Sequence, residues 1–135
     1  MADAFSRARD YAHVALAAVR LFNGATALLA PDFLTRRLGG GPEGNRPELY
    51  AFRMFGIRTV LIALELLLSK GEARTRALNF GVLIHASDTA SAAIAGARGE
   101  VPRRAARMTT AISACNTLLA LIARRPKRWV GWLER

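Results

Sequence analysis

The sequence has one cysteine and two histidines among its 135 residues. A single cysteine cannot form a disulfide within the chain, which excludes a disulfide scaffold and a cysteine-rich zinc module. Acidic residues are also scarce, with ten Asp and Glu against twenty Lys and Arg, which leaves a net charge of +10. A disordered basic segment is excluded because 52% of the residues are hydrophobic. The length suits one core, so we expect residues 1–135 to form a single domain.

Four apolar stretches rich in Ala and Leu cover most of the chain, at residues 10–30, 48–69, 77–96 and 105–123. Alanine and leucine favour helix, and the prolines fall outside the stretches, at Pro31, Pro47, Pro102 and Pro126. A helix of about twenty residues rises about 30 Å, the thickness of the hydrocarbon core of a bilayer. The sequence therefore predicts an all-α protein, an antiparallel four-helix transmembrane bundle, with a loop over residues 31–47.

A soluble helical protein is the alternative, but its helices would carry a broad charged face. Here the segment 108–123 has no charged residue, and the third stretch has only Asp88. Other charged residues do lie inside the stretches, namely Arg20, Arg53, Arg58 and Glu65, and the mean hydropathy is only +0.16. Each charge near mid-bilayer costs about 2.5–3.5 kcal/mol unless it is paired or faces inward. The membrane interpretation therefore requires these side chains to face one another.

Lys and Arg residues near the ends of the stretches indicate the orientation. Ten lie on the side of the two termini and the second connection, and seven lie on the opposite side. Because cytoplasmic connections carry the excess of positive charge, we expect a multi-pass inner-membrane protein with both termini in the cytoplasm.

The tail, residues 124–135, combines basic and aromatic side chains just after the fourth stretch. We expect this cytoplasmic tail to contact anionic lipid headgroups through Arg124, Arg125, Lys127, Arg128, Trp129 and Trp132. Nucleic acid is not expected as a partner, because the basic residues are spread over every connection and form no single stripe.

Polar residues recur at helical spacing, so each stretch presents them on one face. We predict that they form a polar seam inside the bundle, made of Arg20, Asn23, Arg58, Glu65, His85, Asp88 and Asn116. Buried charges persist when paired, so Asp88 is predicted to bridge Arg20 or Arg58. The seam is either an ion-pair network that fixes helix register or a pocket for a substrate or ion. In a pocket, Glu65, Asp88 and His85 are the candidate catalytic groups.

Two further patterns carry less information. His85 and Asp88 are i, i+3 neighbours, but two ligands without a third do not make a metal site, so we predict no metal and no cofactor. The small residues Ser87, Ser91 and Ala95 permit close helix approach, either within the bundle or in a homo-oligomer.

Three segments, LFNGATALLAPDFLTRRLG, FRMFGIRTVLIALELLL and HASDTASAA, resemble small four-span bacterial membrane proteins of uncharacterised families, DoxX-like in outline. The resemblance lies in a Gly-containing first helix that ends at a proline, a Gly-Ile-Arg early in the second, and an aspartate in the third. The matching positions are Gly24, Pro31, Gly56, Ile57, Arg58 and Asp88. The resemblance implies a four-span fold and no particular activity, and the Ala- and Arg-rich composition suits an actinobacterium.

These observations favour a small integral membrane protein that serves as a binding or accessory module, for a hydrophobic ligand or for a larger membrane complex. The first alternative is a membrane-embedded enzyme that uses Glu65 or Asp88 as acid or base on an apolar substrate. The second alternative is a soluble helical regulator with a basic surface.

Overall fold

The computed structural model describes residues 2–40 and 46–124, and this part of the chain is helical with no strand. It contains α1 (Ala2–Leu29), α2 (Pro31–Arg37), α3 (Arg46–Leu68), α4 (Gly71–Ala97) and α5 (Arg103–Ala123). Each predicted apolar stretch forms most of one long helix, and the all-α prediction is confirmed. In the tail, Arg124 is exposed beyond the end of α5, and residues 125–135 lie outside the described residues.

Helix α2 corrects the expected loop over residues 31–47, because Pro31–Arg37 is helical. Pro31 begins this helix, where its fixed φ suits the first turn and its missing N–H needs no partner. Asp32 lies in the first turn, and Arg36 and Arg37 lie in the last, which matches the helix dipole at both ends. The Thr35 hydroxyl donates a hydrogen bond to the Pro31 carbonyl oxygen at 3.1 Å.

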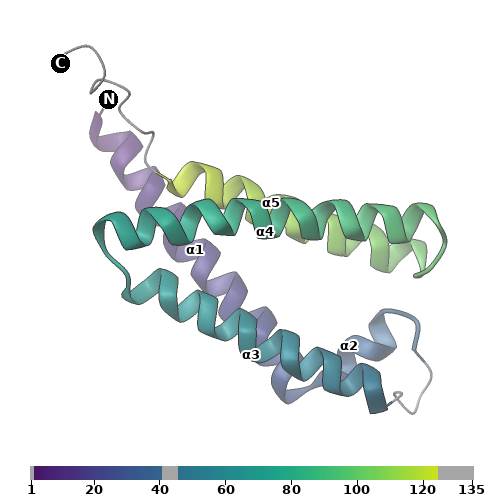
Figure 1. The fold of residues 1–135 in the computed structure, drawn as a ribbon. Helices are drawn as coiled ribbons and strands as arrows, with labels where there is room; N and C mark the ends of the chain where they lie inside the picture. Colours follow the sequence, from purple (N-terminus) through teal and green to yellow (C-terminus); the bar gives the residue numbers. More distant parts are fainter. Residues whose placement is uncertain (1, 41–45, 125–135) are drawn as a thin grey trace, which may run out of the picture.

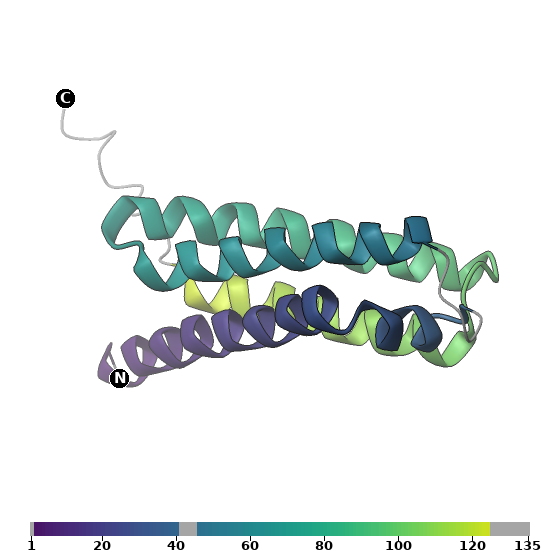
Figure 2. The ribbon, with the colours of Figure 1, turned by 90° about the horizontal axis from the view of Figure 1, so that it is seen from below.

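The four long helices form two antiparallel pairs, α1 with α3 and α4 with α5 (Figure 1). Helix α1 also packs on α5, whereas α3 and α4 touch over a much smaller region. Neighbouring helices run in alternate directions (Figure 2), so the start of α1, the α3–α4 connection and the end of α5 lie at one end of the molecule. Helix α2 and the α4–α5 turn lie at the other end.

The interior is built from small side chains. Among the described residues, nine of the twelve buried hydrophobic residues are alanine, whereas many Leu, Ile and Phe side chains are exposed. The largest buried cluster lies at the end of the molecule that holds the start of α1, and we call it the packed end. It consists of Ala12, Leu16, Leu66, Ala77, Leu78, Ala120 and Ala123. The opposite end, beside α2, has no such cluster among the described residues, and we call it the hollow end.

Two helices of the described chain are long and apolar enough to cross a membrane, Ala4–Leu29 within α1 and Arg103–Ala123, which is α5. Only 39% of the apolar segment of α1 and 28% of that of α5 are buried, unlike the core helix of a soluble protein. Helices α3 and α4 are not among these candidates. The apolar part of α3 is interrupted by three charged residues, Arg53, Arg58 and Glu65, and that of α4 by His85 and Asp88. A membrane location is therefore supported by two of the four predicted spans.

Candidate ligand-binding cavity

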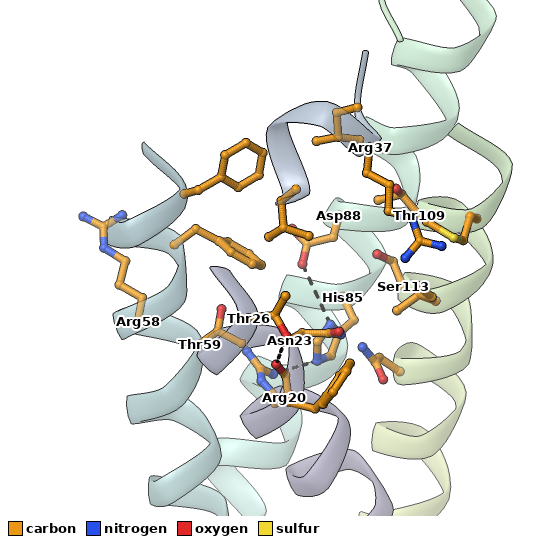
Figure 3. A pocket seen from close by; sticks show the side chains of 18 of the residues that line it. Arg20, Asn23, Thr26, Arg37, Arg58, Thr59, His85, Asp88, Thr109 and Ser113 are labelled. Atoms are coloured by element: carbon orange, nitrogen blue, oxygen red, sulfur yellow. Dashed lines mark hydrogen bonds and ion pairs between the residues drawn. The ribbon is translucent and has the colours of Figure 1, made fainter. Parts of the chain in front are cut away.

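A cavity of about 860 Å³ occupies the hollow end. All five helices contribute to its wall, which is mostly apolar and includes Phe22, Phe33, Leu34, Leu38, Phe52, Phe55, Ile62, Ile84, Met108 and Ile112. Five polar side chains of the cavity wall are buried and form what we call its floor, namely Arg20, Thr59, His85, Ser113 and Asn116. Figure 3 shows four of them, Arg20, Thr59, His85 and Ser113. Exposed residues of the wall, among them Arg37, Glu48 and Asp88, mark its mouth. The cavity thus combines an apolar wall with a small polar floor.

A chain of three polar side chains runs from the floor toward the mouth. Arg20 on α1 is only 3% exposed, and its Nη1 donates a hydrogen bond to Nε2 of His85 on α4 at 2.7 Å. A guanidinium can only donate, so Nε2 of His85 accepts and carries no proton. His85 is therefore neutral, with its proton on Nδ1. That nitrogen faces Oδ2 of Asp88 at 3.8 Å, across a gap too long for a direct hydrogen bond.

The predicted direct ion pair between Asp88 and an arginine is wrong. Among the described residues, no arginine nitrogen lies within 4 Å of Asp88, and the nearest side-chain partner of its carboxylate is the neutral imidazole of His85. The physical reason is the position of the imidazole, which lies between Arg20 and Asp88 and contacts both. The Asp88 side chain is 47% exposed and lines the cavity.

Two buried polar atoms at the floor have no hydrogen-bond partner among the described residues. They are Nε of Arg20 and Oδ1 of Asn116. Native proteins pair nearly all buried polar groups, because an unpaired one costs about 1–3 kcal/mol, and more when charged. Arg20 lines the cavity, and no described carboxylate lies within 4 Å of its guanidinium.

Six of the seven residues predicted for the polar seam line this one cavity: Arg20, Asn23, Arg58, His85, Asp88 and Asn116. Arg58 lies at its edge, because the side chain is exposed and its guanidinium points away from Arg20 and His85 (Figure 3). Glu65 is absent from the cavity wall and is exposed.

The placement of Glu65 in the seam is therefore a correction, and the helix geometry explains it. Glu65 lies one heptad after Arg58, so both occupy the same exposed face of α3. The buried face of α3 carries Gly56, Thr59, Ala63 and Leu66.

Several wall residues were not singled out from the sequence. Thr59 is a buried polar residue of α3. It could not be singled out because the sequence does not show which face of this helix is buried. Arg37 and Phe33 come from α2, which was expected to be loop, and the Arg37 guanidinium lies 5.4 Å from the centre of the Phe33 ring. The proline at position 31 followed by Asp32 was the available signal for this helix.

Comparison with protein-family models, curated proteins and solved structures found no match for the chain. Within the described residues, no group of three or more His, Cys, Asp and Glu side chains is placed to hold a metal ion. The polar groups of the cavity are therefore one buried guanidinium, a neutral imidazole, hydroxyls and amides, and the rest of its wall is apolar.

Proposed function

We propose that this chain is a four-span protein of a bacterial inner membrane, DoxX-like in outline, that binds a hydrophobic ligand in the cavity of the hollow end. The observation that supports this most directly is Arg20, which is 3% exposed, lines a largely apolar cavity and has no carboxylate within 4 Å among the described residues. Small-molecule sites usually measure about 300–1,000 Å³, with a few polar groups set in an apolar wall. The cavity volume of about 860 Å³ fits this range.

The distribution of side chains supports the membrane part of the proposal. Leu, Ile and Phe side chains are exposed along the long helices, including Phe22, Leu61, Phe80, Leu83 and Leu118. Soluble monomers rarely expose so much apolar surface, whereas lipid solvates it. Alanine-rich contacts between helices are typical of membrane proteins, where close backbone approach replaces the packing of large side chains. With both termini cytoplasmic, the hollow end would face away from the cytoplasm.

Ligand binding is favoured over a purely structural role in a membrane complex. An ion-pair network that only fixes helix register would fill the interior and pair its charges. Here the interior is hollow at one end, and Arg20 has no carboxylate partner within 4 Å among the described residues.

The enzyme alternative receives less support from the cavity. Glu65 lies outside it, and Nε2 of His85 is occupied by the hydrogen bond from Arg20, so this nitrogen cannot take a proton from a substrate. Asp88 is the remaining acid or base candidate at the mouth.

Two measurements test the proposal. Membrane fractionation should recover the protein only with detergent, and recovery in the aqueous fraction would refute the membrane location. Lipid extraction and mass spectrometry of the purified protein should then find a bound amphiphile.

A matched pair of variants on α5 links this ligand to the cavity. Thr109→Phe places a ring in the wall and should reduce the bound amphiphile, whereas Ala111→Phe, at an exposed position outside the wall, should not. Equal amounts of amphiphile in both variants would place the ligand elsewhere.

A further inference from the structure

The charge of Arg20 lacks a counter-charge at the floor of the cavity. Its hydrogen-bond partner, His85, is neutral, and Asp88 is one side chain further away and 47% exposed. A buried cation in a setting of low polarity is costly unless an anion lies against it. Thr59, Ser113 and Asn116, the other buried polar side chains of the cavity, carry no charge.

The guanidinium of Arg20 has one hydrogen-bond partner among the described residues. Its Nη1 donates to Nε2 of His85, and this contact holds the guanidinium plane. Arg20 lines the cavity, and 3% of the residue is accessible. A guanidinium binds a carboxylate through charge-assisted hydrogen bonds, so an anionic group at the floor of the cavity is the counter-charge that Arg20 lacks.

The rest of the cavity suits one negative charge attached to an apolar body. Among the described residues of its wall, Arg20 is the one buried side chain that carries a charge, and the other charged residues of the wall are exposed. A monoanion neutralises the charge of Arg20, and a dianionic phosphate would exceed it. The wall above the floor is apolar, so the remainder of the ligand is a hydrocarbon chain or ring system.

We infer that the ligand is an acidic amphiphile whose single carboxylate is bound by the guanidinium of Arg20 at the floor of the cavity. This inference rests on the proposed ligand-binding function and names the chemistry of the ligand. His85 acts as a positioning residue, because it orients the guanidinium and does not need to touch the ligand.

The experiment compares three probes with one hydrocarbon chain and different headgroups: oleate, oleyl alcohol and oleylamine. Binding to the purified full-length protein in detergent is measured by native mass spectrometry, at a pH that keeps the carboxylate ionised. A charge-assisted hydrogen bond contributes about 1.5–3 kcal/mol, so oleate should bind about 10- to 100-fold more tightly than oleyl alcohol. Oleylamine should bind more weakly than either, because its ammonium would face Arg20.

Two variants test whether Arg20 causes the preference for oleate over oleyl alcohol. Arg20→Gln should lower oleate affinity to that of oleyl alcohol, while Arg53→Gln should retain the preference, since Arg53 is an exposed arginine outside the cavity wall. Because the first variant removes a buried side chain, its fold is checked by circular dichroism. If it is unfolded, the three probes on the unmodified protein decide the inference alone.

The outcomes separate this inference from the function on which it rests. Equal affinity for the three probes would overturn the carboxylate assignment and leave a cavity that binds hydrophobic molecules. No binding of any probe would overturn both. A preference for oleate that persists in a folded Arg20→Gln protein would also overturn the assignment, because the carboxylate would then bind elsewhere.

Discussion

Nε2 of His13 on α1 donates a hydrogen bond to the backbone carbonyl oxygen of Leu66 on α3, with 2.7 Å between the two atoms. A carbonyl only accepts, so this Nε2 carries the proton, whereas Nε2 of His85 accepts from Arg20. The two histidines are therefore opposite tautomers. Leu66 lies in the last turn of α3, where carbonyl groups lack partners within the helix. His13 satisfies one of them and joins α1 to α3 at the packed end.

Replacement of His13 by Phe should destabilise the fold. It leaves the buried Leu66 carbonyl without its partner, at a cost of about 1–3 kcal/mol. The midpoint of thermal unfolding in detergent should fall, while oleate affinity stays the same because His13 is remote from the cavity wall. Val14→Phe is the control, since Val14 is exposed beside it. An unchanged midpoint in His13→Phe would show that the hydrogen bond contributes nothing to stability.

The crossing of α1 and α3 at Gly24 and Gly56 gives a second prediction. A Cβ on Gly56 would lie 2.6 Å from the Leu28 nitrogen and 2.7 Å from the Gly24 oxygen, which are both backbone atoms. Helix α1 would have to move away, so Gly56→Ala should destabilise the protein by about 1–3 kcal/mol.

Gly81→Ala is the matched control for this crossing. Its added Cβ meets nothing closer than the Ala120 Cβ at 3.9 Å, and alanine favours helix by about 1 kcal/mol. Thermal unfolding should therefore show no loss of stability. Equal destabilisation by both substitutions would mean that the close approach at Gly56 does not determine helix packing.

The sequence allowed the four long helices and six polar residues of the cavity to be predicted, because helical spacing assigns residues to faces. Arg20, Asn23, His85, Asp88 and Asn116 were placed together in this way, on three different helices. The spacing does not say which face of a helix turns inward. For α3 the contact at Gly56 decides this, and it buries the Thr59 face and exposes Glu65.

The spacing of residues in the sequence also does not identify the partner of a charged side chain. Arg20 and Asp88 both line the cavity, but the imidazole of His85 lies between them and contacts both. The distance that decides between a direct and a bridged contact is smaller than one helical turn, and the rotation of each helix sets it.

This bridged contact changes the expected cost of losing Asp88. A partner for a buried arginine would be worth about 3–5 kcal/mol. Asp88 is 47% exposed and contacts His85 at 3.8 Å, so Asp88→Asn should cost less than about 1 kcal/mol. His85→Leu removes the acceptor of the buried Arg20 and should cost about 1–3 kcal/mol. Thermal unfolding of both variants tests this order, and a larger loss for Asp88→Asn would indicate a direct pair with arginine.

A substitution on the exposed face of α4 tests whether the protein lies in a membrane or in water. Leu83 is 66% exposed and lies near the middle of the predicted third span, whereas Leu68 is 77% exposed at the end of α3. In a bilayer, Leu83→Lys carries an ammonium group into the hydrocarbon core at a cost of about 2.5–3.5 kcal/mol. Lysine at position 68 extends its ammonium to the headgroups and costs much less. In water both changes affect exposed positions and would be within about 0.5 kcal/mol of neutral.

The measurement is the amount of folded protein recovered from membranes for Leu83→Lys and Leu68→Lys. Loss of the first variant with normal recovery of the second is the expected result, because depth in the bilayer is the difference between two similarly exposed leucines. Normal recovery of both would mean that water surrounds α4. The four-span proposal would then be wrong, and the apolar surface would need a protein partner to cover it.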